Sequence, residues 1–174
     1  MRRALKAATL ALAITAAAVI GTTTPAAQAG RWTPVTVFTL DANGTDLPAM
    51  QVAADWSKGT NVLVRAGSCS GARCIKLTEP VNPTHCTPPG MSVILGCAGF
   101  TLEDGSCGVE VYTFLRAYPD ARRYTTAHEV GHCVGLKHLA DPRALMYPSA
   151  NLAPRIVAPT RTDKSALNSL YPRT

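Results

Sequence analysis

Three of the four histidines of this 174-residue chain lie in a single short run. The run begins with His128-Glu129, continues to His132 and ends at His138. Residues four apart lie one turn apart on the same face of a helix, so His128 and His132 can point their imidazoles at one ion. Glu129 is rotated away from that direction, where it can reach a water on the metal without binding the metal. The spacing therefore predicts a helix that holds a metal ion, and imidazole ligands favour zinc.

Gly135 follows the second histidine by three positions. Glycine adopts positive φ readily, so it can end the helix and reverse the chain, which brings His138 in from another side. Three protein ligands leave one tetrahedral position for water, as in catalytic rather than structural zinc sites. We therefore expect one catalytic zinc ion, bound by His128, His132 and His138, with Glu129 as general base.

The histidine run resembles the metzincin signature, H-E-x-x-H-x-x-G-x-x-H followed by a Met-turn. Residues 141–148 resemble the Met-turn of the matrixins, and residues 163–171 resemble their last helix. The resemblance implies a secreted zinc endopeptidase of a small bacterial type, which hydrolyses peptide bonds by Glu-assisted attack of zinc-bound water. It also implies that Met146 forms an apolar floor beneath the zinc. Tyr147 and Pro148 would begin the wall of the substrate pocket.

The chain departs from these families at several positions. Pro148 stands where astacin-type and serralysin-type metzincins have a tyrosine, so a tyrosine metal ligand is not expected. Pro148-Ser149-Ala150 replaces the Pro-x-Tyr that is usual in matrixins, which leaves the pocket wall and the specificity open. His85 is the one histidine outside the run, so we expect no histidine-rich structural zinc site and place His85 at the surface.

The first 29 residues have the parts of a secretory signal peptide. A basic head precedes an apolar stretch over residues 7–21, and Ala27-Gln28-Ala29 forms a small-residue cleavage site. The apolar stretch of about 15 residues is shorter than the roughly 20 that cross a bilayer, so a membrane anchor is the weaker alternative. We expect cleavage after Ala29, an extracellular catalytic domain at residues 30–174, and no room for a propeptide with a cysteine switch.

The net charge of the chain argues against a nucleic-acid-binding protein. Residues 1–29 hold three basic residues and no acidic ones, so their removal lowers the formal charge from +6 to +3. A mildly basic surface of this kind does not predict nucleic-acid binding. The expected partner is a protein or peptide substrate, and the expected state is a monomer without a membrane anchor.

All six cysteines lie within residues 30–174. An even number in a small exported domain predicts disulfides, and six cysteines allow 15 pairings. A four-cysteine zinc site is a weaker alternative because no C-x-x-C pair occurs. Cys133 follows a metal ligand, but a rotation of about 100° around the helix favours a disulfide over a role at the metal. The expected pairs are Cys69–Cys74, Cys86–Cys97 and Cys107–Cys133.

The order of strand-like and helix-like segments along the chain predicts an α+β domain with a twisted, mostly parallel sheet over two helices. A small irregular C-terminal subdomain, rich in proline, is expected to end in a helix capped by Thr162. An edge strand, at residues 92–95 or 100–103, would bind substrate by strand addition. Strands are predicted at residues 35–40, 61–65, 75–78, 92–95 and 108–115, and helices at 47–58, 124–135 and 163–170.

Two other functions are compatible with the same residues. The domain could be a zinc-containing binding module that has lost catalysis, although every expected catalytic position is intact. It could also be a narrow hydrolase for one cell-wall or partner peptide. No calcium-binding loop motif is present, although Glu103 and Asp104 could contribute to such a site.

Overall fold

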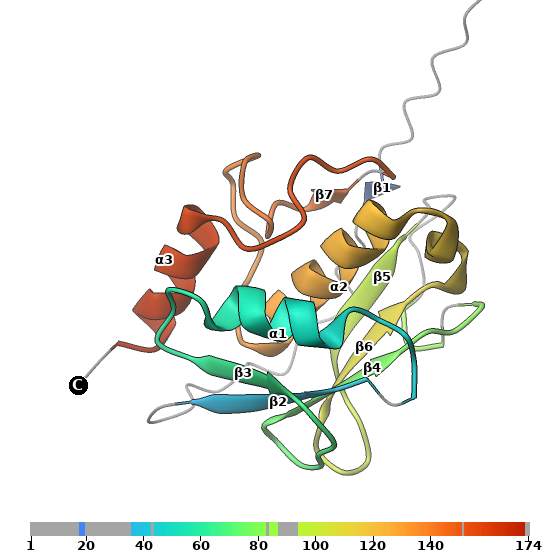
Figure 1. Cartoon of the computed structure of the whole chain (residues 1–174), viewed down its shortest axis with the longest axis horizontal. Coiled ribbons are helices and arrows are strands. Elements are labelled where there is room, and N and C mark those ends of the chain that lie inside the picture. The colour runs from blue at the N-terminus through green and yellow to red at the C-terminus, as the bar shows by residue number, and fades with distance from the viewer. Residues whose placement is uncertain are drawn as a thin grey trace, which may run out of the picture.

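A computed structural model describes residues 18–19, 36–42, 44–82, 84–86, 94–150 and 152–172. Its centre is a five-stranded sheet with the order β3-β2-β4-β6-β5 (Figure 1). A second, two-stranded pairing joins β1 (Ala18–Val19) to β7 (Ser149–Ala150) in antiparallel fashion. The strands of the main sheet are β2 (Val37–Asp41), β3 (Leu63–Ala66), β4 (Cys74–Thr78), β5 (Gly96–Thr101) and β6 (Cys107–Val111).

Four strands of the main sheet run parallel, and β5 alone is antiparallel to its neighbour. β2 pairs in parallel with β3 and β4, and β4 pairs in parallel with β6. β5 pairs only with β6 in this sheet, so it forms one edge. The helix α1 (Ala49–Ser57) connects β2 to its parallel neighbour β3, so the three elements form a βαβ unit.

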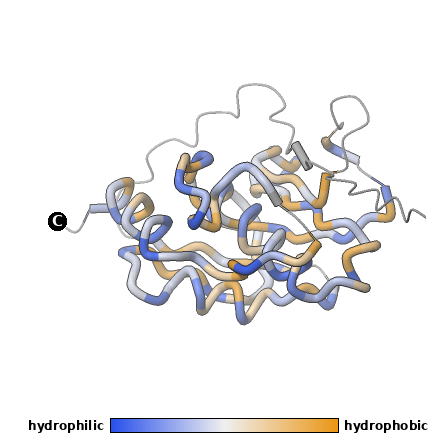
Figure 2. Tube along the Cα trace, turned by 90° about the horizontal axis from the view of Figure 1, so that it is seen from above, coloured by the Kyte–Doolittle hydropathy of each residue, from blue (hydrophilic) through white to orange (hydrophobic). Residues whose placement is uncertain are grey.

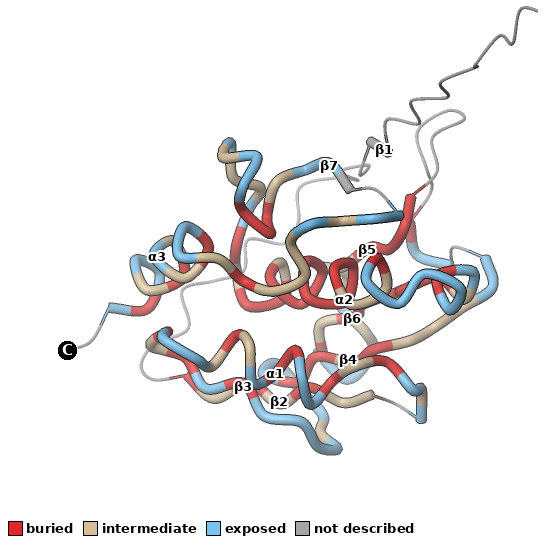
Figure 3. Tube along the Cα trace, turned by 45° about the horizontal axis from the view of Figure 1, so that its top comes forward, coloured by how far each residue is buried: buried red, intermediate tan, exposed pale blue. Residues whose placement is uncertain are grey.

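The helices α1 and α2 (Pro119–Cys133) lie on the same face of the sheet (Figure 1). Every residue of α2 from Tyr124 to Gly131 is buried, so this part of the helix is enclosed on all sides (Figure 3). Apolar residues recur along the strands and helices between more polar ones (Figure 2), as expected for elements with one face in a core. The indole of Trp56 in α1 donates a hydrogen bond of 2.9 Å to the carbonyl of Ala127 in α2. This bond joins the two helices where α2 enters the histidine run.

After α2 the chain is largely irregular until α3 (Arg161–Leu170) near the C-terminus. The expected fold class is therefore confirmed: a mostly parallel sheet over two helices, and an irregular segment that ends in a third helix. Among the described residues, no helix has the length and apolar character needed to cross a membrane.

Several predicted boundaries were wrong. The strand predicted at residues 92–95 begins only at Gly96, and residues 92–93 lie outside the described part of the chain. The strand predicted at 108–115 ends at Val111, where a 3-10 helix, η1 (Thr113–Ala117), takes over. The helix predicted from Tyr124 begins at Pro119, because proline is well suited to the first position of a helix.

The cap of α3 also differs from the prediction. Thr160, not Thr162, is the N-cap residue, and it forms a reciprocal capping box with Asp163. The hydroxyl of Thr162 instead donates to Asp141 at 3.3 Å. Two threonines at this spacing are equivalent as sequence signals, and the position of Asp163 decides between them.

Three disulfides join Cys69 to Cys74, Cys86 to Cys97, and Cys107 to Cys133. These are the pairs that the sequence analysis favoured, and Cys133 is therefore not available as a metal ligand. The predicted signal peptide lies outside the described residues except for the two residues of β1.

Candidate metal centre

The end of α2 sets the direction of the third histidine. Gly135 has a φ of +98°, its N–H donates to the carbonyl of His132, and the N–H of Leu136 donates to the carbonyl of Gly131. This pair of bonds is the Schellman arrangement, in which a left-handed residue ends the helix. The chain then turns back toward the helix, as the glycine predicted, and brings His138 to the same side as His128.

The three imidazoles of the run converge on one point. One ring nitrogen each of His128, His132 and His138 lies within 4.8 Å of the others. The Nε2 atoms of His128 and His138 are 3.3 Å apart. Two nitrogens at about 2.05 Å from a tetrahedral zinc are separated by roughly 3.3 Å, so this spacing fits such an ion.

Backbone carbonyls fix which nitrogen of two imidazoles faces the centre. His128 donates from Nδ1 to the carbonyl of Leu145 at 2.7 Å, and His132 donates from Nδ1 to the carbonyl of Leu136 at 2.9 Å. A carbonyl oxygen only accepts, so Nδ1 carries the proton in both rings and Nε2 keeps its lone pair. Bonds of this kind orient the histidine ligands of metal sites.

Burial also keeps the three imidazoles neutral. It lowers the pKa of His128 to about 3 and that of His132 to about 4, and nearby imidazoles add to both shifts. Burial lowers the pKa of His138 as well. Metal ions bind the neutral imidazole, so no proton has to be displaced from these rings near neutral pH.

Glu129 lies beside this centre and is almost wholly buried. With no metal charge nearby, burial raises the pKa of its carboxyl to about 8. A divalent cation next to the carboxyl would favour the ionised form, which a general base requires. Gly96 of β5 packs on this side chain: a Cβ at Gly96 would lie 2.6 Å from Thr125 and 3.4 Å from the Cγ of Glu129.

Met146 lies beneath the histidine run and is fully buried. It packs against Gly131, which sits between the glutamate and the second histidine of the run. A Cβ at Gly131 would overlap the sulfur of Met146 and lie 2.9 Å from the ring of Trp56. Glycine is therefore required at this position to let the methionine approach the helix.

Replacing Gly131 with alanine tests this close packing. Alanine raises helix propensity by about 1 kcal/mol, but overpacking in a core costs about 1 to 3 kcal/mol. Because neither the backbone nor the Trp56 ring can move freely, we expect the overpacking to prevail and the variant to be less stable. Urea unfolding measures the effect, and a variant as stable as the parent would contradict the contact with Met146.

Tyr124 is a feature of the site that the sequence analysis missed. Its hydroxyl lies 3.3 Å from the carbonyl of Tyr147, 3.4 Å from that of Ser149 and 3.4 Å from Nδ1 of His128. The buried ring thus links a histidine of the run to the segment after the Met-turn. It lies one helical turn before His128, which is the signal that could have identified it.

Asp163 is the second residue whose role was not foreseen. Its buried carboxylate accepts hydrogen bonds from the backbone N–H of Leu145 at 2.9 Å and of Met146 at 3.0 Å. It also accepts from the N–H and hydroxyl of Thr160 at 2.8 and 2.7 Å. Asp163, the acidic member of α3's capping box, therefore also fixes the Met-turn, whose Leu145 carbonyl orients His128.

The two residues predicted for the pocket wall come directly after Met146 in the sequence. Tyr147 is half-buried and Pro148 is exposed. Both lie on the segment that the Tyr124 hydroxyl contacts, close in sequence to Met146.

Comparison with known proteins agrees with this geometry. The matrixin family model, Peptidase_M10, matches residues 110–172, a segment that contains the three histidines, Glu129, Met146 and α3. No curated protein matches the chain. The chain is thus matrixin-like, as its sequence implied, and the match supports a zinc metallopeptidase in general.

Proposed function

We propose that this matrixin-like chain is a secreted zinc endopeptidase that uses one catalytic zinc ion. The observation that carries the proposal is the convergence of three imidazoles, two of them oriented by backbone carbonyls, beside a buried glutamate. His128, His132 and His138 would hold the ion, and the 3.3 Å between the Nε2 atoms of His128 and His138 fits it. Zinc in such a site lowers the pKa of a bound water and polarises a carbonyl.

In the proposed reaction Glu129 accepts a proton from the attacking water and passes it to the leaving amine. The substrate lies along the free edge of β5 and pairs with it as an added strand. Gly96 brings that strand against the Glu129 side chain, which would place the scissile bond of a paired substrate next to the proton acceptor. Tyr147 and Pro148 border the pocket for the residue after the cut.

We further propose that residues 1–29 are removed on export and that residues 30–174 act outside the cell. Three disulfides support this, since disulfides persist in oxidising compartments. The match to the matrixins supports a peptide substrate. The small positive net charge of residues 30–174 supports neither a nucleic-acid nor a membrane partner.

Metal removal tests the proposal. The mature protein is expected to degrade casein, to lose this activity in a chelator and to recover it when zinc is returned. The binding-module alternative predicts one bound zinc and no degradation of casein under any of these conditions. Degradation that continues after the metal has been removed would contradict the proposal.

A further inference from the structure

The face of β5 and β6 that points away from α2 carries a small apolar cluster of its own. Gly96 faces α2, so its neighbour Cys97 faces the opposite side of the sheet. The cluster is separate from the main core and is covered by the segment of residues 84–86. Its buried members are Cys86, Ile94, Cys97 and Tyr112, with Phe100 packed against them.

A buried carboxylate holds the covering segment. Glu110 of β6 is only 1% exposed, although it is charged. It accepts hydrogen bonds from the N–H of Thr84 at 3.1 Å and from Nδ1 of His85 at 2.6 Å, and a further one from the Thr84 hydroxyl. Burial alone would raise the pKa of Glu110, but these hydrogen bonds outweigh it and hold the pKa below its usual value. The carboxylate is therefore ionised and bound to donors.

A covalent anchor lies next to this ionic one. Cys86 follows His85 directly and forms a disulfide with Cys97 of β5. Cys97 is the residue opposite Glu110 in the pairing of β5 with β6. The disulfide and the carboxylate thus fix consecutive residues of one segment to one cross-strand pair.

An aromatic stack extends the contact along β5. The ring of His85 lies parallel to that of Phe100, with centroids 4.0 Å apart and an interplanar angle of 5°. The ring of Phe100 also lies against Gly108 of β6, where any Cβ would overlap the ring. His85 is exposed, as the sequence predicted. Its side chain nevertheless contacts both β5, through Phe100, and β6, through Glu110.

β5 is therefore held from both faces. On one face Gly96 packs against Thr125 and Glu129 of α2. On the other face the segment of residues 84–86 is fixed by Glu110 and the disulfide. β5 is an edge strand with one strand neighbour, so fewer ladder bonds hold it than hold the inner strands.

We propose that Glu110 and the Cys86–Cys97 disulfide form a clamp that positions β5 beside Glu129 and so prepares the edge to which a substrate strand adds. Glu110 is a positioning residue in this arrangement and does not touch the substrate. The inference rests on the proposed function, because it assigns the substrate to β5. The claim that the clamp orders β5 does not depend on the proposed function, because it can be measured in a protein without activity.

The test is Glu110→Gln in the zinc-loaded mature protein. Glutamine keeps the shape but replaces one of the two accepting oxygens by an NH2 group, which cannot accept from Thr84 N–H or from Nδ1–H of His85, so the anchor loses its charge and one of its acceptor atoms. If β5 then occupies its binding-competent position one-tenth of the time, KM rises about 10-fold while kcat stays within about 2-fold. Hydrogen exchange of the amides of residues 96–101 is expected to accelerate, and the zinc content is expected to stay unchanged.

Asp104→Asn is the matched control. Asp104 follows β5 and also forms an ion pair, with Lys76 at 2.7 Å, but both partners are partly exposed. Exposed pairs contribute little, so KM and the exchange of β5 should stay at parent values. A milder variant, His85→Phe, keeps the ring stack and removes only the Nδ1–H donor. It should raise KM about 3-fold, and it replaces Glu110→Gln as the test if that variant does not fold.

Three results would overturn the clamp. The first is a Glu110→Gln protein whose KM and β5 exchange equal those of Asp104→Asn. The second is a loss of kcat at unchanged KM, which would mean that Glu110 acts in the chemical step. The third is unchanged β5 exchange and KM in a folded His85→Phe protein when Glu110→Gln does not fold. If the parent protein cleaves no peptide, the proposed function fails, and the exchange comparison alone decides whether the clamp orders β5.

Discussion

Glu129→Gln is expected to lower kcat/KM for peptide hydrolysis by about 100-fold to 10,000-fold, the range that general acid–base catalysis contributes. Glutamine keeps the volume of a side chain that packs against Gly96, so the strand beside it should not move. It cannot accept the proton of an attacking water. The three histidines are unchanged, so the variant should still bind one zinc per chain.

The measurement pairs steady-state kinetics with metal analysis of the same sample. Glu110→Gln serves as a comparison, since it should change KM while Glu129→Gln changes kcat. A Glu129→Gln protein with full activity would remove Glu129 from the mechanism. One that loses zinc together with activity would mean that Glu129 supports the metal and not the proton transfer.

Asp163→Ala is expected to cause the largest loss of stability, about 3 to 5 kcal/mol, because it leaves several buried donors without an acceptor. The N–H groups of Leu145, Met146 and Thr160 all donate to this carboxylate. Zinc affinity should fall as well, because the carbonyl of Leu145 orients His128. The two effects share one cause, the loosening of the Met-turn.

Urea unfolding of zinc-loaded protein measures the change, with Asp141→Ala as the control. Asp141 is the first residue of the Met-turn segment and forms an ion pair with Arg143, which is largely exposed. Its removal should cost at most about 1 kcal/mol. Equal losses in the two variants would contradict the role assigned to the buried carboxylate of Asp163.

The convergence of the three histidines could be predicted from the sequence because its geometry is local. His128 and His132 are related by one helical turn, and Gly135 ends the helix by its own conformational freedom. Only His138 depends on the path of the chain, and that path spans three residues. Spacing alone was enough to bring these side chains together.

The parts that the sequence did not predict depend on contacts between distant segments. β5 contains two glycines and has little strand propensity, and Gly96 is there because α2 packs against it. Asp163 is the first residue of a predicted helix, and nothing in the sequence indicated that its carboxylate binds the backbone of the Met-turn. Glu110 lies in a run with strand character and gave no sign that it binds residues 26 and 25 positions earlier.

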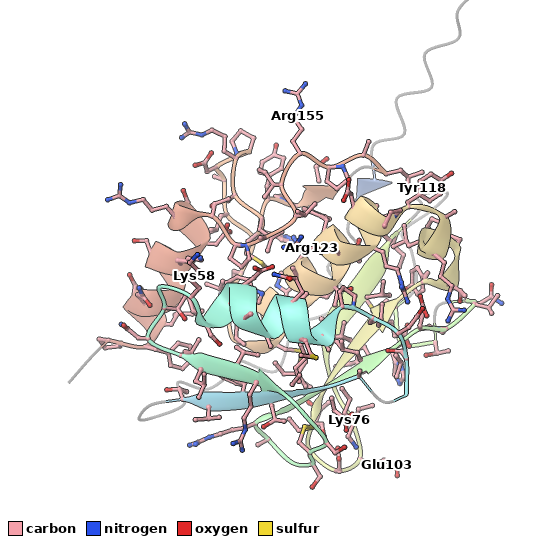
Figure 4. All side chains as sticks on the ribbon, in the orientation of Figure 1. Lys58, Lys76, Glu103, Tyr118, Arg123 and Arg155 are labelled. Atoms are coloured by element: carbon pink, nitrogen blue, oxygen red, sulfur yellow. A yellow bond between two sulfur atoms is a disulfide. The ribbon has the colours of Figure 1, made fainter. Side chains whose placement is uncertain are left out.

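The start of α2 was missed for a different reason. Pro119-Asp120 is a usual helix start, but the arginines that follow interrupt the apolar pattern. Arg123 lies between α1 and α2 (Figure 4), where it forms an ion pair of 2.8 Å with Asp55. A charged residue can thus face another helix when its partner is there, which periodicity of apolar residues does not register.

The measurement that tests the central claim most directly is a peptide-library digest by the mature protein, read by mass spectrometry with metal analysis of each sample. The account predicts cuts at internal peptide bonds, one zinc per chain, loss of all cuts on chelation and their return with zinc. Many cut sites would exclude a hydrolase dedicated to one peptide. The absence of internal cuts at one zinc per chain would contradict the account.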